Sequence, residues 1–173
     1  FSKEGFVAVS PVSIQFIDGE RYAIVGESGS GKTTLARMIA GLQRPTAGNI
    51  YANGIPVYGK HKVRTNYFRE VQIIQQDSSS ALDPKMSIGK SIEEPLLCFF
   101  HLDKEERKKR CHDLMNLCNL PVEYYSRLPA ELSGGEQKRV AIARALAAEP
   151  KCLIFDEATN GFDLPLRKKI IEE

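Results

Sequence analysis

The sequence has no apolar stretch close to the roughly 20 residues that a membrane-spanning helix requires. If a membrane is involved, we therefore expect another chain to cross it. The formal net charge of +2 is also too small to indicate a nucleic-acid partner, and we expect none. A basic run extends from Lys104 to Arg110, but Glu105 and Glu106 interrupt it, which favours a solvated helix face.

Patterns typical of metal sites and disulfides are absent too. The four cysteines include no CxxC pair and mostly lie among apolar residues, which indicates reduced, buried cysteines in an intracellular protein. The three histidines are scattered and form no ligand cluster. There is no signal peptide and the chain starts at Phe1, so we expect a fragment or a sequence without its true start. A length of 173 residues fits one globular domain.

A glycine-rich segment of the form GxxxxGK[ST] stands out against this background. It lies between an apolar run, Tyr22 to Val25, and a segment with the spacing of an amphipathic helix. The apolar positions of that helix are Leu35, Met38, Ile39 and Leu42. The glycine-rich residues are Gly26, Glu27, Ser28, Gly29, Ser30, Gly31, Lys32 and Thr33. We predict a phosphate-binding loop between a buried strand and a helix.

The residue types of this segment suit a phosphate ligand. Glycines permit positive φ and let backbone N–H groups surround an anion at a helix N-terminus, where the helix dipole favours negative charge. Lys32 adds a positive charge for the β- and γ-phosphates, and the Thr33 hydroxyl is placed to bind Mg²⁺. The alternative is a turn that binds nothing, which the match of both flanks to the motif disfavours.

Several short strands are predicted around this loop. Weak alternation over residues 6–17 and the run Tyr22 to Val25 predict strands before the loop. After the helix, residues 49–52 and 55–57 predict a hairpin around the Asn53-Gly54 turn. A β-branched run over residues 69–76 ends in Gln76, which suits either a ligand site at the edge of a parallel sheet or a solvated strand end.

From residue 78 to about 148 the pattern becomes helical. Helices are predicted near residues 88–100, 104–119 and 122–127, as an insertion into an α/β core. The insertion closes with Leu132 to Glu136, in which Ser133 and Glu136 fit a capping box. The capping box leaves Gly134 and Gly135 unexplained, and these two bare positions would let a second phosphate approach a helix N-terminus.

The last apolar run, Cys152 to Phe155, ends in two carboxylates, Asp156 and Glu157. Carboxylates at the end of a buried strand need a partner, because burying an unpaired charge is costly. Asp156 is suited to hold Mg²⁺, and Glu157 is suited to take a proton from an attacking water. The alternative is an acidic strand-ending turn with no role.

With these motifs in this order, the chain resembles the ATP-binding subunit of ABC transporters over essentially its whole length. The resemblance implies an α/β fold: a P-loop NTPase core of the ABC ATPase type, with an N-terminal antiparallel β region and an inserted helical subdomain. It implies core residues 1–77, a helical subdomain over 78–148 that ends in the signature helix, and a return to the core over 149–173. It also implies ATP and Mg²⁺ as cofactors and a head-to-tail dimer of two ATPase subunits, identical or paralogous.

The resemblance also assigns roles to single residues. Walker A corresponds to Gly26 through Thr34, and the signature to Ser133, Gly134 and Gly135, with Glu136 where many members have Gln. Gln76 matches the Q-loop glutamine that senses Mg²⁺, Asp156 the Walker B aspartate and Glu157 the catalytic base. Lys32 would act in catalysis as well as binding. Phe1, or alternatively Phe6, matches the aromatic residue that stacks on adenine.

Two features depart from the family pattern. Only Asp163 is retained in the D-loop, which reads Asn160-Gly161-Phe162-Asp163 here. No histidine follows Walker B, so the switch histidine has no counterpart before the chain ends at Glu173. We therefore expect this fragment to bind ATP better than it hydrolyses it.

Residues 76–89 and the sequence Glu94-Pro95-Leu96 are similar to ATPases of dipeptide, oligopeptide and nickel importers. This similarity implies a subunit at the cytoplasmic face of the cell membrane, docked to permease subunits through Leu82 to Leu97. The form Leu132 to Gln137 also fits an exporter or a lipoprotein-releasing ATPase, and a non-transport ABC ATPase is a further alternative.

Overall fold

The computed structural model describes residues 7–58, 61–77 and 81–156 and divides into two compact units, residues 1–68 and 69–173. Each unit is described by itself. Within the described residues no helix has both the length and the apolar composition to span a membrane. The division into functional parts at residues 77/78 and 148/149 stays a prediction.

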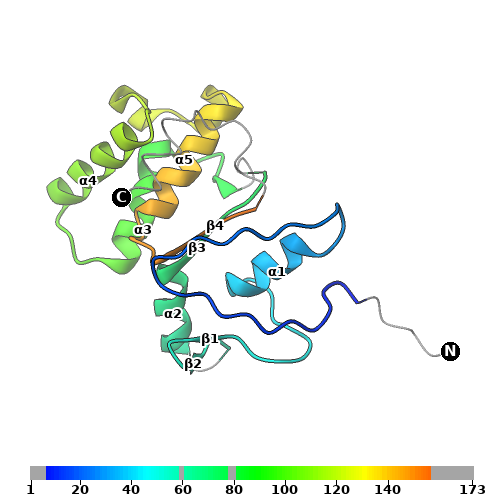
Figure 1. Cartoon of the computed structure of the whole chain (residues 1–173). Coiled ribbons are helices and arrows are strands. Elements are labelled where there is room, and N and C mark those ends of the chain that lie inside the picture. Colours follow the sequence, from blue (N-terminus) through cyan, green and yellow to red (C-terminus); the bar gives the residue numbers. More distant parts are fainter. Residues whose placement is uncertain (1–6, 59–60, 78–80, 157–173) are drawn as a thin grey trace. The chain divides into compact units, whose positions relative to one another are not determined.

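The first unit contains the helix and the hairpin that the sequence predicts. Helix α1 comprises Lys32–Ile39, and strands β1 (Tyr51–Ala52) and β2 (Ile55–Pro56) pair antiparallel, as labelled in Figure 1. The hairpin turn has φ of 50° at Asn53 and 77° at Gly54, which an Asn-Gly pair adopts at little cost. The hairpin prediction is therefore confirmed.

Helix α1 ends where a glycine allows the chain to turn back. Gly41 has φ of 74°, and an added Cβ would lie 3.1 Å from the ring of Phe68 and 3.2 Å from that of Tyr67. Both rings belong to α2 (His61–Glu70), a helix that the sequence analysis missed. The Tyr67 hydroxyl donates to the Ile39 carbonyl, and so satisfies one of the last carbonyls of α1.

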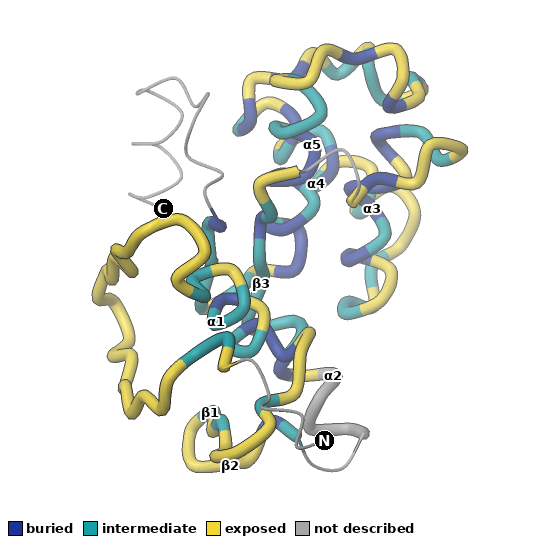
Figure 2. Tube along the Cα trace, turned by 90° about the vertical axis from the view of Figure 1, so that its right-hand side faces the viewer, coloured by how far each residue is buried: buried dark blue, intermediate teal, exposed yellow. Residues whose placement is uncertain are grey.

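The strands expected in residues 6–17 and at Tyr22 to Val25 do not form in the described part of the chain. Residues 7–30 have no regular secondary structure, and Figure 2 shows this segment exposed over nearly all its length. Val25, expected in a buried strand, is 90% exposed. Alternating apolar residues favour an extended backbone, but a strand exists only where a neighbour pairs its N–H and C=O groups.

The second unit combines a parallel strand pair with a group of helices (Figure 1). Strands β3 (Val71–Ile74) and β4 (Cys152–Phe155) pair in parallel. Val71 lies opposite Cys152 at one end of the pair, and Ile74 lies opposite Phe155 at the other. Between the two strands, the described residues 75–77 and 81–151 include three α-helices and the short 3₁₀ helices η2 and η3. The α-helices are α3 (Ile88–Phe99), α4 (Lys104–Leu117) and α5 (Gly134–Leu146), and the 3₁₀ helices are η2 (Val122–Ser126) and η3 (Pro129–Glu131).

The core of this unit is built by the apolar faces of its three α-helices. The fully buried side chains at its centre are Ile88, Ile92, Leu96, Cys111, Met115, Val140 and Ile142. In α4 the buried face has i, i+4 spacing from Cys111 to Met115, and Cys118 continues it beyond the helix end. The helices predicted near residues 88–100 and 104–119 are thus confirmed as packed α-helices, and the segment predicted at 122–127 forms the 3₁₀ helix η2.

The cysteines follow the prediction in part. Cys111 and Cys118 are buried and Cys152 is partly buried, but Cys98 is exposed near the end of α3, so the expectation of burial was wrong there. All four are free. No group of three or more His, Cys, Asp and Glu side chains capable of holding a metal lies within residues 7–58, 61–77 and 81–156.

A buried carboxylate joins α3, α4 and η2. Glu93 is 8% exposed and accepts from the Tyr125 hydroxyl at 2.7 Å and from Arg107 Nε at 3.3 Å. These partners compensate its burial, since an unpaired carboxylate would be costly there. Burial and the hydrogen bond to Glu93 raise the pKa of Tyr125. The short helix η2 is thereby tied to both of its neighbours.

Replacing Gly89 tests this packing. A Cβ at Gly89 would overlap the ring of Tyr125, so Gly89→Ala must displace the ring from Glu93. We expect a loss of about 1–3 kcal/mol in the free energy of unfolding, measured in urea. The control is Gly134→Ala, where no atom lies within 4 Å and no loss is expected. Equal stability of the two variants would contradict the packing described here.

Cys111 provides a test in alkaline solution. Burial, with the charge of Glu93 second, raises the pKa of the Cys111 thiol from 9.0 to about 12. Between these values the unfolded chain loses a proton that the folded chain keeps. The stabilisation is therefore complete below pH 9 and is lost as the pH rises toward 12, by up to about 1.4 kcal/mol per pH unit.

The measurement is the pH slope of the unfolding free energy between pH 9 and 11. Cys111→Ala should flatten this slope whatever the variant costs in absolute stability, because the titrating group is gone. The exposed Cys98 is the matched position, and Cys98→Ala should keep the parent slope. If Cys111→Ala and the parent lose stability equally steeply, the thiol is not the group responsible.

Candidate functional site

The predicted phosphate loop leads directly into α1. Gly29 and Gly31 have φ of 79° and 90°, and the Ser30 N–H donates to the Glu27 carbonyl at 3.2 Å, so the loop closes in a tight turn. Gly31 is the N-cap of α1 and makes no side-chain hydrogen bond to the first turn. Because Gly31 has no side chain, it does not cap the N–H groups of the first turn. An anion site at a helix N-terminus requires such uncapped N–H groups.

Gly31 is needed for close approach as well as for its φ angle. An added Cβ would overlap the Ala8 carbonyl oxygen and lie 3.0 Å from a methyl group of Val9. Any larger residue would thus push the loop away from the chain segment that precedes it. Contacts within the first unit therefore require glycine at position 31.

Lys32 curls back over the loop that precedes it. Its Nζ donates to the carbonyls of Gly26 at 2.9 Å and Glu27 at 2.7 Å. Thr33 and Thr34 occupy the first turn of α1. The ammonium group and the backbone N–H groups at the helix start form a donor set that fits the oxygens of a polyphosphate.

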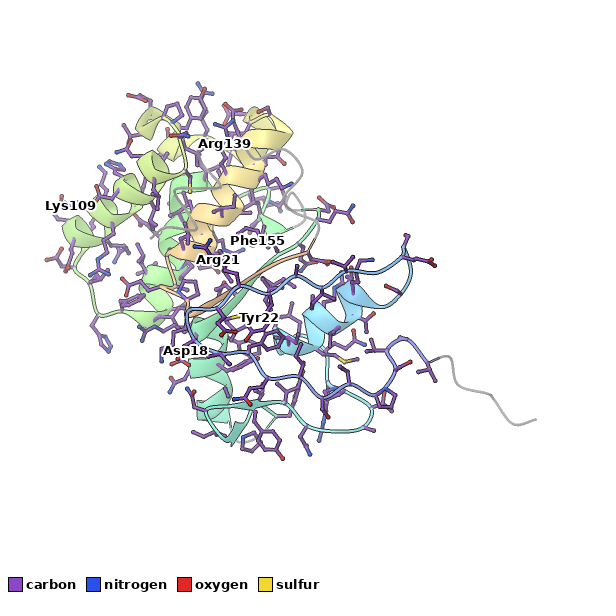
Figure 3. All side chains as sticks on the ribbon, in the orientation of Figure 1. Asp18, Arg21, Tyr22, Lys109, Arg139 and Phe155 are labelled. Carbon is purple, nitrogen blue, oxygen red and sulfur yellow. The ribbon has the colours of Figure 1, made fainter. Side chains whose placement is uncertain are left out.

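In the second unit, Gln76 and Asp156 lie at the same edge of the strand pair. Asp156 directly follows Phe155, the last residue of β4, which is labelled in Figure 3. Its backbone N–H donates to the Ile74 carbonyl at 3.0 Å and so extends the pairing by one residue. Gln76 comes two residues after β3 ends and is exposed, while Asp156 is 7% exposed.

This arrangement bears on the two interpretations of Gln76. Its position just after a strand whose parallel partner ends at the buried Asp156 favours a ligand site over a solvated strand end. A carboxylate and an amide oxygen are ligands that Mg²⁺ accepts in proteins, so the two residues fit the metal. Their predicted roles as metal ligands stay a prediction.

The capping box at the start of α5 forms as predicted. The Glu136 N–H donates to the Ser133 hydroxyl oxygen at 3.4 Å, and the Ser133 N–H donates back to the Glu136 carboxylate at 2.8 Å. The Ser133 hydroxyl also donates to this carboxylate at 2.7 Å. These hydrogen bonds lower the pKa of Glu136.

Gly134 and Gly135 are not explained by the packing of the chain. A Cβ added at either position would meet no described atom within 4 Å, and both residues are exposed. Glycine in a helix costs about 1 kcal/mol relative to alanine, so two of them side by side weaken the first turn of α5. No contact within the described residues therefore accounts for these two glycines.

The structure adds Gln137, which the sequence analysis did not identify. Its side-chain amide donates to the carbonyls of Pro129 at 2.9 Å and Leu132 at 3.2 Å, and so holds the segment before Ser133 against α5. Both partners are main-chain atoms, which leave no trace in side-chain patterns. Only the fold could identify this contact.

Three of the predictions lie outside the described residues. They are the adenine-stacking residue at Phe1 or Phe6, the catalytic base Glu157, and the D-loop at residues 160–163.

Comparison with known proteins now adds independent evidence. Residues 9–160 match the family model described as ABC transporter. The chain is 43% identical over 157 residues to the nickel import ATP-binding protein NikE of Brucella abortus (strain 2308), covering 90% of the chain and 59% of NikE. It is 36% identical over 170 residues to the oligopeptide transport ATP-binding protein OppF of Lactococcus lactis subsp. lactis (strain IL1403), covering 97% of the chain and 53% of OppF.

Solved structures show the same fold. A dimeric, post-hydrolysis structure of the ATP-binding cassette MJ0796 bound to ADP and Pi superposes with a TM-score of 0.84 at 31% identity, covering 95% of the chain and 72% of MJ0796. CbiO1 of Clostridium perfringens, part of the transporter complex cbiONQ, gives 0.77 at 28% identity and covers 95% of the chain and 66% of CbiO1. The predicted fold class is thereby confirmed.

The chain spans 59% and 53% of the lengths of NikE and OppF, so the activity of the whole protein is treated as a proposal below. The family itself is established by the match over residues 9–160 and by two relatives at 43% and 36% identity. This chain belongs to the ABC transporter family, as its ATP-binding domain.

Proposed function

We propose that the chain is the ATP-binding and ATP-hydrolysing motor part of an importer for peptides or nickel and other metal complexes. The glycine loop at the start of α1, with Lys32 folded over it, is the observation that carries the nucleotide assignment. The names of the relatives, nickel import and oligopeptide transport ATP-binding proteins, support import over export. We place the protein at the cytoplasmic face of the membrane, attached through separate permease subunits.

In this proposal the first unit holds the triphosphate. The N–H groups at the start of α1 and the Lys32 ammonium bind the phosphate oxygens, and the adenine stacks on Phe1 or Phe6. By resemblance to the family, Thr33 of the first unit and Gln76 and Asp156 of the second are the residues that would bind Mg²⁺. The metal, when bound, neutralises charge on the phosphate oxygens.

Hydrolysis is assigned to Glu157, which follows Asp156 in the sequence. A carboxylate at that position orients the attacking water and accepts its proton, while Lys32 stabilises the charge that develops on the phosphate. Phosphoryl transfer depends mainly on such positioning and charge neutralisation.

A second copy or a paralogue completes the site from its own signature segment. The open backbone at Gly134 and Gly135 supports this proposal, because an incoming phosphate meets no side chain there. The structure of MJ0796 is described as dimeric, which is a further support by similarity. Ser133 and Glu136 would border the same phosphate.

The permease is proposed to dock on residues 82–97. Most of α3 faces the core, but Lys85, Lys90 and Leu97 are exposed, and Leu97 keeps 58% of its surface accessible. We propose that the permease contacts these exposed residues of the 82–97 segment.

The proposal is tested with Glu157→Gln in the full-length protein, assembled with its permease. The amide keeps the size of the side chain but accepts no proton, so ATP hydrolysis should fall roughly 100-fold or more. Affinity for ATP, measured by titration, should stay within about twofold of the parent. Hydrolysis at the parent rate would disprove the assignment of Glu157.

Lys32→Ala is the contrasting variant in the same assay. Loss of a charge-assisted contact to phosphate should weaken ATP binding roughly tenfold or more, so both binding and hydrolysis decline. Unchanged ATP affinity in this variant would contradict the nucleotide assignment itself.

A further inference from the structure

Arg144 on α5 bridges two acceptors that come from different segments of the second unit. One guanidinium nitrogen, Nη1, donates to the Ala81 carbonyl at 2.7 Å. The other, Nη2, donates to the Glu94 carboxylate of α3 at 2.7 Å. The side chain is 34% exposed and Glu94 is 45% exposed, so the bridge lies at the surface of the unit.

Only arginine suits this geometry. Its planar fork presents two nitrogens in fixed directions, whereas the lysine ammonium is a point charge that would serve one acceptor well at a time. An exposed ion pair contributes little to stability, so the pair with Glu94 alone gives no strong reason for the residue. The structural role of Arg144 therefore comes from its second hydrogen bond, to the Ala81 carbonyl.

The hydrogen bond from Arg144 holds the chain at Ala81, a few residues after Gln76. Next to Ala81, the Leu82 side chain is 5% exposed and belongs to the apolar core. Before Gln76, Ile74 is held in the strand pair by its register with Phe155 and by the Asp156 N–H. Ile74 is therefore held on the strands, and Ala81 is held on the helices.

Arg144 lies on the same helix as the signature residues. Ser133 caps the N-terminus of α5, and Arg144 lies in its last turn. At about 1.5 Å per residue the two are roughly 16 Å apart along one continuous helix. Ala81 and Ser133 are therefore both hydrogen-bonded to residues of one continuous helix.

We propose that Arg144 is a positioning residue that couples residues 81–94, which it contacts at Ala81 and Glu94, to the signature helix. It would transmit displacement of residues 81–94, where the permease is proposed to dock, to Ser133, Gly134 and Gly135. This inference rests on the proposed function and adds to it the residue that carries the signal within the second unit.

The test uses Arg144→Met in the full-length protein assembled with its permease in lipid nanodiscs. The matched control is Arg139→Met on the same helix; Arg139, labelled in Figure 3, also donates to a main-chain carbonyl, that of Asn119 at 3.3 Å. Arg144→Lys serves as a second variant, which keeps the charge but cannot bridge both acceptors. ATP affinity, thermal unfolding and ATPase rates with and without permease are measured for each.

We expect Arg144→Met to lower the permease-stimulated ATPase rate about three- to tenfold, while ATP affinity of the detached subunit changes less than about twofold. Arg144→Lys should show the same loss, because one bond of the bridge is gone. Arg139→Met should keep the stimulated rate. Hydrogen exchange of residues 81–86 should speed up in Arg144→Met and not in Arg139→Met.

The inference is overturned if Arg144→Met and Arg139→Met reduce the stimulated rate equally, or if Arg144→Met leaves it unchanged. It is also overturned if the loss follows a fall in melting temperature rather than the exchange at residues 81–86. A parent complex without any ATPase activity would disprove the proposed function and this inference with it. An active parent with an unaffected Arg144→Met disproves only the coupling role.

Discussion

Parallel pairing of β3 with β4 holds the second unit together. The two strands lie on either side of the whole helical segment in the sequence, so their contact closes a long loop at an entropic cost. The packed helices between them offset that cost by burying Ile88, Ile92 and Leu96 against Val140 and Ile142. The same pairing places the polar residues Gln76 and Asp156 at one edge of the sheet.

The helical segment serves the site through one helix. Helix α5 begins with a hydrogen-bonded capping box, and its two first glycines have no neighbour within 4 Å of an added Cβ among the described residues. The helix packs by Val140 and Ile142 into the core. The first turn is thus weak in helix propensity but fixed in position by the capping box and by Gln137. A backbone surface that is rigid and bare suits the binding of an anion from outside the chain.

The sequence predicts features that depend on neighbours along the chain, and misses those that depend on partners far away. The loop before α1, the Asn53-Gly54 hairpin and the capping box of Ser133 follow from local rules, and all three form. The expected strands near Val25 do not form, because alternation says nothing about a pairing partner. Burial of Cys98 was wrong because the position of a residue around the helix, rather than its type, decides its exposure.

We propose that the edge of the sheet beside β4 holds the metal of a bound nucleotide. Binding of Mn²⁺, a paramagnetic substitute for Mg²⁺, measures the occupancy of this site. The full-length protein is titrated with Mn²⁺ in the presence of ADP, and bound metal is read by electron paramagnetic resonance. Asp156→Asn should weaken this binding about tenfold or more, because a carboxylate ligand becomes a neutral amide. The exposed carboxylate of Asp113 supplies the control variant, Asp113→Asn, which should bind as the parent does. Equal Mn²⁺ affinity in the parent and in Asp156→Asn would contradict the account.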